Sequence, residues 1–256
     1  IYTNIYSFNK NVLKKTVESL KRGVIAGLPT ETVYGLAGNA YSEKAVKKIY
    51  KLKNRPKKNP LIIHYLNLKD AEKDVIFNKN FLKLYRKFCP GPITFILEKK
   101  IKSKISYLAT ANLNTVAIRF PNHKITKSIL KLINFPLAMP SANISTRVSP
   151  VNARDVFDEF GKRIKIIIDG GNSKIGIEST VIDLTDKPRI LRPGIISANE
   201  IKFLFRSSFS KRKSKVKSPG MFKKHYSPGI PVILGGKPFN KNHAYIVYGK
   251  KYKKNK

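Results

Sequence analysis

The sequence predicts an α/β fold, with layers of helix around one sheet. The main observation is that short apolar, strand-like runs alternate with segments whose apolar residues recur at helical spacing. Of the 256 residues, 41% are hydrophobic and 10% are aromatic, so the chain can bury a substantial core and a wholly disordered basic protein is excluded. The single cysteine, Cys89, excludes a disulfide framework and a multi-cysteine zinc site.

Helices are predicted where a capping residue precedes apolar residues at helical spacing. Asn9 can cap the first helix, which stops at Gly23, and Ser42 can cap the second, residues 43–52. The remaining predicted helices cover residues 80–88, 125–133, 153–160 and 198–205.

Strands are predicted where short apolar runs lie between turn-forming segments. The first, residues 24–28, is followed by residues 29–40, which we interpret as a functional loop. The other predicted strands are residues 61–65, 93–97, 116–120, 136–139, 165–169, 180–184 and 189–191.

The chain divides by composition into three parts. Residues 1–205 contain all the elements above and are predicted to form one domain. Residues 206–229 are rich in Ser, Lys, Arg, Gly and Pro, which is typical of a linker. Residues 230–256 hold two apolar runs, too few for an independent core, so a truncated or degenerate domain is expected there.

The charge is strongly unbalanced. There are 52 Lys and Arg against 15 Asp and Glu, a net charge of +37, and residues 206–256 contain 15 basic residues and no acid. Such a surface favours polyanions, either RNA or the phosphates of a nucleotide. Biased codon usage, which would leave lysines scattered over solvated helix surfaces, explains the same composition, and the sequence alone leaves both readings open.

The cellular location is expected to be the cytoplasm. One cysteine suits a reducing compartment, and the N-terminal segment lacks the apolar stretch of a secretory signal. The least charged stretch, residues 24–42, contains Pro29 and several polar residues, which makes it a poor membrane span, so no membrane partner is expected. The chain begins with Ile rather than Met, so missing sequence is allowed for.

The chemistry is predicted in four polar loops, because the motifs GxxxxGK[ST], GxGxxG, HExxH and CxxC are absent. These loops follow predicted helices or strands at residues 29–40, 53–60, 140–150 and 170–180. Ligands of open α/β sheets gather at the carboxyl ends of strands. An ordinary connection remains the alternative for any single loop.

Individual side chains in these loops suit phosphate or ribose. Lys53 and Arg55 present cations to phosphate oxygens, unless the loop is simply a solvated basic turn. Polar donors also cluster after the strand at residues 136–139, where capping and turn formation are the alternative. They are Ser141, Asn143, Ser145 and Ser149.

His64 and Cys89 are two further residues with reactive side chains. His64 ends a short apolar strand and either faces a pocket or is an ordinary core histidine. Cys89, followed by Pro90, has no evident base partner and is interpreted as structural.

Nine sequence motifs carry a family resemblance. They are PTETVYGLAGNA (29–40), KNRPKKNPLIIH (53–64), PGPITFIL (90–97), NTVAIRFP (114–121), PSANISTRVSP (140–150), IIDGG (167–171), GIESTVIDL (176–184), ILRPG (190–194) and SPGMFKKHYSPGIPV (218–232). In this order they closely resemble the YrdC-type threonylcarbamoyl-AMP synthases, and the last motif is similar to the interdomain linker of the family's long members.

The resemblance implies a three-layer α/β fold with a twisted mixed sheet and a nucleotidyltransferase activity. Such enzymes convert L-threonine, bicarbonate and ATP, with magnesium, into threonylcarbamoyl-AMP and pyrophosphate. Other proteins then transfer the threonylcarbamoyl group to the adenosine beside the anticodon of tRNA. Those transfer proteins, and a weak direct contact with tRNA, are the expected macromolecular partners.

The resemblance also implies roles for individual residues. The threonine contacts are Thr30, His64, Arg119 and Ser179, with Arg119 on the carboxylate. The ATP contacts are Arg55, Asn59, Thr115, Ser141, Ser149, Arg192 and, from the linker, Tyr226, which would reach back over the nucleotide. Lys53 and Arg55 are the catalytic candidates, since they would place charge beside the phosphates, and no residue is expected to bind a metal directly.

The sequence departs from the family pattern at two places, and two other functions remain as alternatives. The family's TVYGLG reads Leu36-Ala37-Gly38 here, and only 28 residues follow Pro228 where long members carry a second domain. One rival is a carbamoyltransferase containing a similar domain, although such proteins carry further catalytic modules. The other is a non-catalytic RNA-binding module, which exposed aromatic residues on a strand would support.

Overall fold

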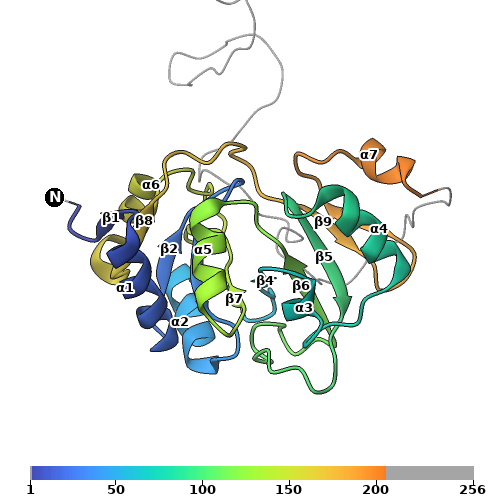
Figure 1. The fold of residues 1–256 in the computed structure, drawn as a ribbon, viewed down its shortest axis with the longest axis horizontal. Helices are drawn as coiled ribbons and strands as arrows, with labels where there is room; N and C mark the ends of the chain where they lie inside the picture. Colours follow the sequence, from blue (N-terminus) through green and yellow to red (C-terminus); the bar gives the residue numbers. More distant parts are fainter. Residues whose placement is uncertain (1, 206–256) are drawn as a thin grey trace, which may run out of the picture.

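The computed structural model describes residues 2–205, which form one mixed ten-stranded sheet (Figure 1). The strand order is β1-β8-β2-β3-β7-β4-β6-β5-β9-β10. The strands are β1 (Ile5–Ser7), β2 (Ala26–Leu28), β3 (Gly35–Asn39), β4 (Ile62–His64), β5 (Ile93–Glu98), β6 (Thr115–Arg119), β7 (Leu137–Ala138), β8 (Ile166–Asp169), β9 (Thr180–Asp183) and β10 (Arg189–Arg192). The helices are α1 (Lys10–Lys21), α2 (Glu43–Lys53), α3 (Leu68–Ala71), α4 (Lys79–Phe88), α5 (Lys124–Leu132), α6 (Ala153–Phe160) and α7 (Ala198–Phe203), with a 3₁₀ turn at Gly161–Arg163.

The helices begin where the sequence places caps. The side chains of Asn9 and Ser42 accept hydrogen bonds from the backbone N–H groups of Val12 and Ala45, so both predicted caps are confirmed. At α6 the Asn152 side chain caps the helix and the side chain of Asp155 bonds back to the Asn152 backbone, which forms a capping box.

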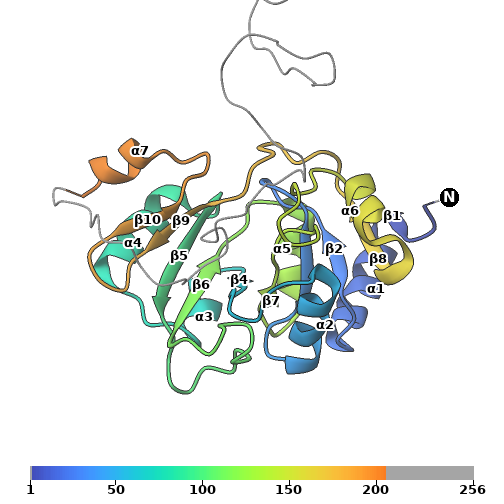
Figure 2. The same cartoon turned by 180° about the vertical axis from the view of Figure 1, so that it is seen from behind.

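Helices cover both faces of the sheet, as the three-layer prediction requires. In β8, Ile166 and Ile168 belong to a core cluster that includes Leu20 of α1 and Ile129 of α5. Ile167, which points to the opposite face, belongs to a separate cluster that includes residues of α2 and α6. Figures 1 and 2 show these two helix pairs on opposite sides.

The structure corrects several predicted elements. The predicted loop 29–40 is wrong in its second half, where β3 pairs antiparallel with both β2 and β7. Gly35 and Gly38 concealed this strand, since glycine is normally depleted in strands. Both lie against neighbouring side chains: a Cβ on Gly35 would lie 2.4 Å from Met139 Cγ, and one on Gly38 2.7 Å from Ile25 Cδ1, so those side chains would have to shift. β1 and α3 were also missed, because three and four residues carry little periodicity.

The departure from the family pattern at Ala37 is accommodated by the core. Ala37 is fully buried in the cluster that contains Leu20 and Ile129, while Gly38 faces α2.

The predicted linker, residues 206–229, and the predicted remnant, residues 230–256, lie outside the described residues. No described helix is long and apolar enough to span a bilayer.

Candidate active site

A cavity of about 420 Å³ collects polar side chains from loops that are far apart in the sequence. Several of them end or follow a strand, such as His64 in β4, Arg119 in β6 and Arg192 in β10. Of the twelve predicted site residues, the cavity is lined by nine: Thr30, Lys53, Arg55, Asn59, His64, Arg119, Ser141, Ser179 and Arg192.

A row of buried polar side chains crosses the neighbouring strands β4, β6, β5 and β9. His64 is paired in register with Arg119, and Arg119 with Thr94 of β5. The Thr94 hydroxyl then hydrogen-bonds the hydroxyl of Ser179, at 2.7 Å, just before β9. Paired residues on adjacent strands share a face, so three predicted threonine contacts lie along one line, with Thr94 between two of them.

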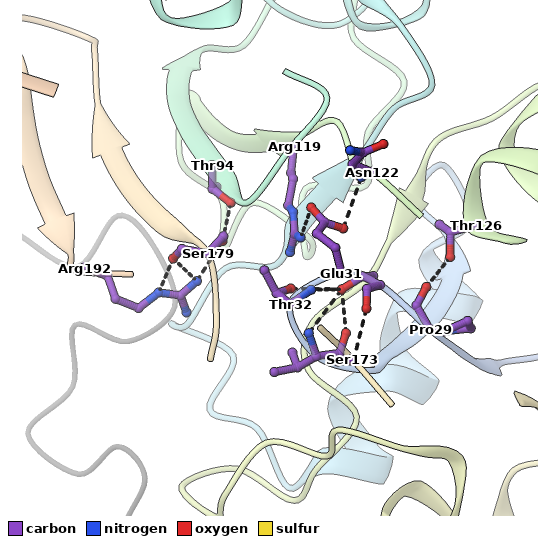
Figure 3. Close-up of polar contacts among 12 residues, drawn as sticks. Pro29, Glu31, Thr32, Thr94, Arg119, Asn122, Thr126, Ser173, Ser179 and Arg192 are labelled. Carbon is purple, nitrogen blue, oxygen red and sulfur yellow. Dashed lines mark hydrogen bonds and ion pairs between the residues drawn. The ribbon is translucent and has the colours of Figure 1, made fainter. Parts of the chain in front are cut away.

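Arg119 is held by a carboxylate that sequence reasoning missed. Its Nη2 lies 2.7 Å from Oε1 of Glu31, and both side chains are almost fully buried (Figure 3). Oε2 of Glu31 accepts a hydrogen bond from the Asn122 backbone N–H. Arg119 Nε is buried and makes no hydrogen bond among the described residues, so the guanidinium keeps donor capacity beside the cavity.

The loop that carries Glu31 is fixed by contacts with two distant segments (Figure 3). The hydroxyl of Thr126 in α5 donates to the Pro29 carbonyl, and the hydroxyl of Ser173 donates to the Thr30 carbonyl. The Thr30 hydroxyl donates to the Val33 carbonyl at 2.6 Å, so it also closes the turn. The PTET motif lies in a predicted site loop, but its glutamate has no signal of its own in the sequence because its partner is 88 residues away.

His64 is neutral at physiological pH. Burial, followed by the charge of Arg119, lowers the pKa of this imidazole well below its usual value. Nδ1 lies 3.2 Å from the Ile62 carbonyl oxygen. The ring also interacts with the backbone of Leu137, and in its neutral form it has one N–H donor and one acceptor nitrogen.

Lys53 is a buried amine that forms no ion pair with a carboxylate of residues 2–205. The prediction that Lys53 belongs to the loop at residues 53–60 is wrong, because it is the last residue of α2. It is 1% exposed, so it is not part of a solvated turn. Its ammonium donates to the carbonyl oxygens of Ser141, at 2.6 Å, and Asn143, at 2.5 Å. Burial, assisted by the charge of Arg55, lowers the pKa of Lys53 from 10.5 to about 7. An anionic ligand in the cavity would therefore stabilise the charged form.

Arg55 and Asn59 are joined in the loop after α2. Arg55 Nη2 donates to Asn59 Oδ1 at 2.6 Å and to the Pro60 carbonyl at 2.7 Å. Asn54 ends the helix in the left-handed region, with φ of 48°, which turns the chain back. The guanidinium is only partly buried and lines the cavity with donors to spare.

Arg192 is the second arginine held by a carboxylate. Its Nη1 forms an ion pair with Oε2 of Glu178, another residue missed from the sequence. Oε1 of Glu178 accepts a hydrogen bond from the hydroxyl of Ser149. Arg192 Nε and Nη2 both donate to the Ser179 carbonyl, so one guanidinium links the predicted ATP and threonine contacts.

Two predicted ATP contacts within the described residues, Thr115 and Ser149, do not line the cavity. Ser149 reaches the cavity wall only through Glu178, and Thr115 lies at the far end of β6, paired with Glu98. Tyr226 lies outside the described residues. Burial raises the pKa of the Cys89 thiol to about 12, in agreement with a structural role.

Two protein-family models match successive parts of the chain. Residues 18–194 match the family model Sua5_yciO_yrdC, described as "Telomere recombination", and residues 196–256 match the model "Threonylcarbamoyl-AMP synthase, C-terminal domain". The chain belongs to the Sua5/YciO/YrdC family. The threonylcarbamoyl-AMP synthase of Pyrococcus abyssi is 40% identical, with 87% of this chain and 67% of that protein covered. That of Schizosaccharomyces pombe is 36% identical, with 87% and 62% covered, so the chain spans about two thirds of these relatives.

A solved member of the Sua5/YciO/YrdC family confirms the fold. The crystal structure of P. abyssi Sua5 complexed with L-threonine has a TM-score of 0.81 and 37% sequence identity, covering 88% of this chain and 68% of that one. The mixed sheet and the three-layer arrangement that the family resemblance implied are therefore confirmed for this chain.

Proposed function

We propose that this chain synthesises threonylcarbamoyl-AMP and pyrophosphate from L-threonine, bicarbonate and ATP. The observation that carries the proposal is that one cavity holds two chemically different sets of side chains. Arg119, Ser179 and neutral His64 suit the carboxylate and the polar groups of an amino acid. Lys53, Arg55 and Arg192 suit a triphosphate.

The reaction needs no protein nucleophile. The threonine amine would attack the carbon of bicarbonate, and loss of water would leave a carbamate. A carbamate oxygen would then attack the α-phosphorus, and the bond to the pyrophosphate oxygen would break. The chain's part is to align the reactants, exclude water and place fixed cations beside the developing charge, for which Lys53 and Arg55 are the catalytic candidates.

Magnesium, when bound with ATP, would supply positive charge that neutralises the phosphates. Mg²⁺ is commonly held by one or two carboxylates together with substrate phosphates. The cavity lining includes the carboxylate Glu178, and no cluster of three or more His, Cys, Asp or Glu side chains in residues 2–205 could hold a metal by itself. This donor set fits an ion carried mainly by the triphosphate.

The two rivals fit less well. The large exposed aromatic residues of the described chain, Tyr2, Tyr107 and Phe203, lie outside the strands, whereas a stacking RNA platform needs them on a strand. A carbamoyltransferase is disfavoured because residues 196–256 match the C-terminal domain of threonylcarbamoyl-AMP synthases. The proposed product serves tRNA modification through separate transfer proteins. Those partners, a weak tRNA contact and a cytoplasmic location remain predictions.

The test is incubation of the purified chain with L-threonine, bicarbonate, magnesium and ATP. We expect pyrophosphate and the adenylate product only when threonine and bicarbonate are both present. Release of ADP and phosphate, indifferent to threonine, would contradict the proposal.

A further inference from the structure

The Ser179 hydroxyl lies in the cavity wall between two partners. The residue is 1% exposed, and its Oγ lies 3.0 Å from Nη2 of Arg192 and 2.7 Å from Oγ1 of Thr94 (Figure 3). Thr94 does not line the cavity and is itself fully buried in β5. The PGPITFIL motif contains Thr94, but nothing in the sequence gave this threonine a role.

The directions of these two hydrogen bonds follow from donor and acceptor counts. A guanidinium only donates, so Arg192 occupies one lone pair of Ser179 Oγ. Among the described residues the Thr94 hydroxyl bonds only to Ser179, and a buried hydroxyl proton needs an acceptor. Thr94 therefore donates to Ser179 and occupies the second lone pair. The proton of Ser179 is left to point into the cavity.

The backbone holds this arrangement in place. β5 and β9 are paired in parallel, with Ile93 beside Thr180, and the Thr180 N–H donates to the Pro92 carbonyl. A Cβ on Gly194 would lie 2.4 Å from the Thr180 nitrogen, so only glycine lets the segment after β10 approach this closely. Arg192 and Ser179 are thereby kept together.

We propose that Thr94 is a positioning residue that fixes Ser179 as a hydrogen-bond donor toward the carboxylate of the amino-acid substrate. The proposal rests on the proposed function. Thr94 is paired with Arg119 on one side and hydrogen-bonded to Ser179 on the other. The Arg119 guanidinium and the Ser179 hydroxyl, which can both only donate, therefore lie on either side of Thr94. A carboxylate offers both of them an acceptor. A carboxamide would turn an N–H donor toward one of them, and a site with fixed polarity rejects such an analogue strongly.

The test compares L-threonine with L-threoninamide in wild type, Thr94→Val and Thr94→Ser. Thr94→Val keeps the shape and removes the hydroxyl, which frees a lone pair of Ser179 to accept from the amide. We expect the KM for threonine to rise about tenfold, the KM for ATP to stay within about twofold, and the preference for threonine over its amide to fall about tenfold. Thr94→Ser should restore all three. Thr16→Val, a matched buried threonine whose hydroxyl bonds a carbonyl within α1, should change none of them.

The double variant Thr94→Val/Ser179→Ala separates positioning from general destabilisation. If Thr94 acts through Ser179, Thr94→Val adds no further loss when Ser179 is already alanine. Additive losses, or an unchanged preference for threonine over threoninamide in Thr94→Val, would overturn the inference while leaving the proposed function intact. If Thr94→Val does not fold, an unchanged preference in Ser179→Ala alone overturns it. Wild-type protein without threonine-dependent pyrophosphate release would overturn both.

Discussion

ATP affinity is expected to fall as the pH rises above about 7, because Lys53 loses its proton in the free protein. Its pKa is lowered from 10.5 to about 7 by burial, with the charge of Arg55 adding to the effect. Both hydrogen bonds recorded for its ammonium go to carbonyl oxygens, of Ser141 and Asn143. A phosphate chain favours the charged amine, so above pH 7 binding must be accompanied by uptake of a proton.

The magnitude follows from the shift. The lowering of the Lys53 pKa from 10.5 to about 7 corresponds to about 5 kcal/mol against the charged amine, with no discount for solvent because the residue is 1% exposed. While the bound-state pKa stays above the working pH, the Kd for ATP rises up to about tenfold per pH unit. Between pH 7.5 and 8.5 the free energy of ATP binding therefore becomes less favourable by about 1.4 kcal/mol.

The measurement is ATP binding by calorimetry, without threonine, at pH 7.5, 8.0 and 8.5. Lys53→Met should bind ATP more weakly and with a flat profile over this range. Lys58→Met removes an exposed lysine of the loop that follows α2 and should keep the wild-type slope. The same linkage predicts that the free energy of unfolding of wild type rises relative to Lys53→Met from pH 7 to 9, because the unfolded chain then binds more protons. Equal slopes of ATP affinity in wild type and Lys53→Met would refute this reasoning.

Four further outcomes are expected. Arg119→Ala should chiefly impair threonine use and Arg55→Ala ATP use, each by about 2–4 kcal/mol in kcat/KM, and equal small losses for both substrates would contradict these assignments. Gly194→Ala should lower the melting temperature, measured by calorimetry, because its Cβ would meet backbone at 2.4 Å. Cys89→Ser should retain activity, and in wild type Cys89 should resist alkylation at pH 8 because its thiol pKa is raised to about 12. Tyr226→Ala should raise the ATP requirement if the linker covers the nucleotide, and unchanged ATP affinity would argue against that role.

The parts of the fold that were predictable are those with local signals. Asn9 and Ser42 are caps followed by helical periodicity, and every predicted strand coincides with an observed one to within three residues at either end. β3 was missed because its glycines serve contacts with Met139 and Ile25, which lie in other segments. The burial of Lys53 was missed for the same reason, since its two carbonyl partners are 88 and 90 residues away.

The cavity's electrostatics depend on the few acidic residues more than on the many basic ones. In a chain of net charge +37, attraction of phosphates and carboxylates is available almost anywhere on the surface, so cations alone could not single out a site. Two of only 15 acids, Glu31 and Glu178, are placed against Arg119 and Arg192, and all four side chains are almost fully buried. Without its carboxylate, a buried arginine would carry an uncompensated charge. If its side chain were mobile, its N–H groups would have no fixed direction toward a ligand. Each carboxylate therefore weakens the raw attraction of its arginine for an anion and fixes the direction in which the remaining N–H groups point. Orientation of these donors, rather than excess of charge, is what separates this cavity from the rest of a basic surface.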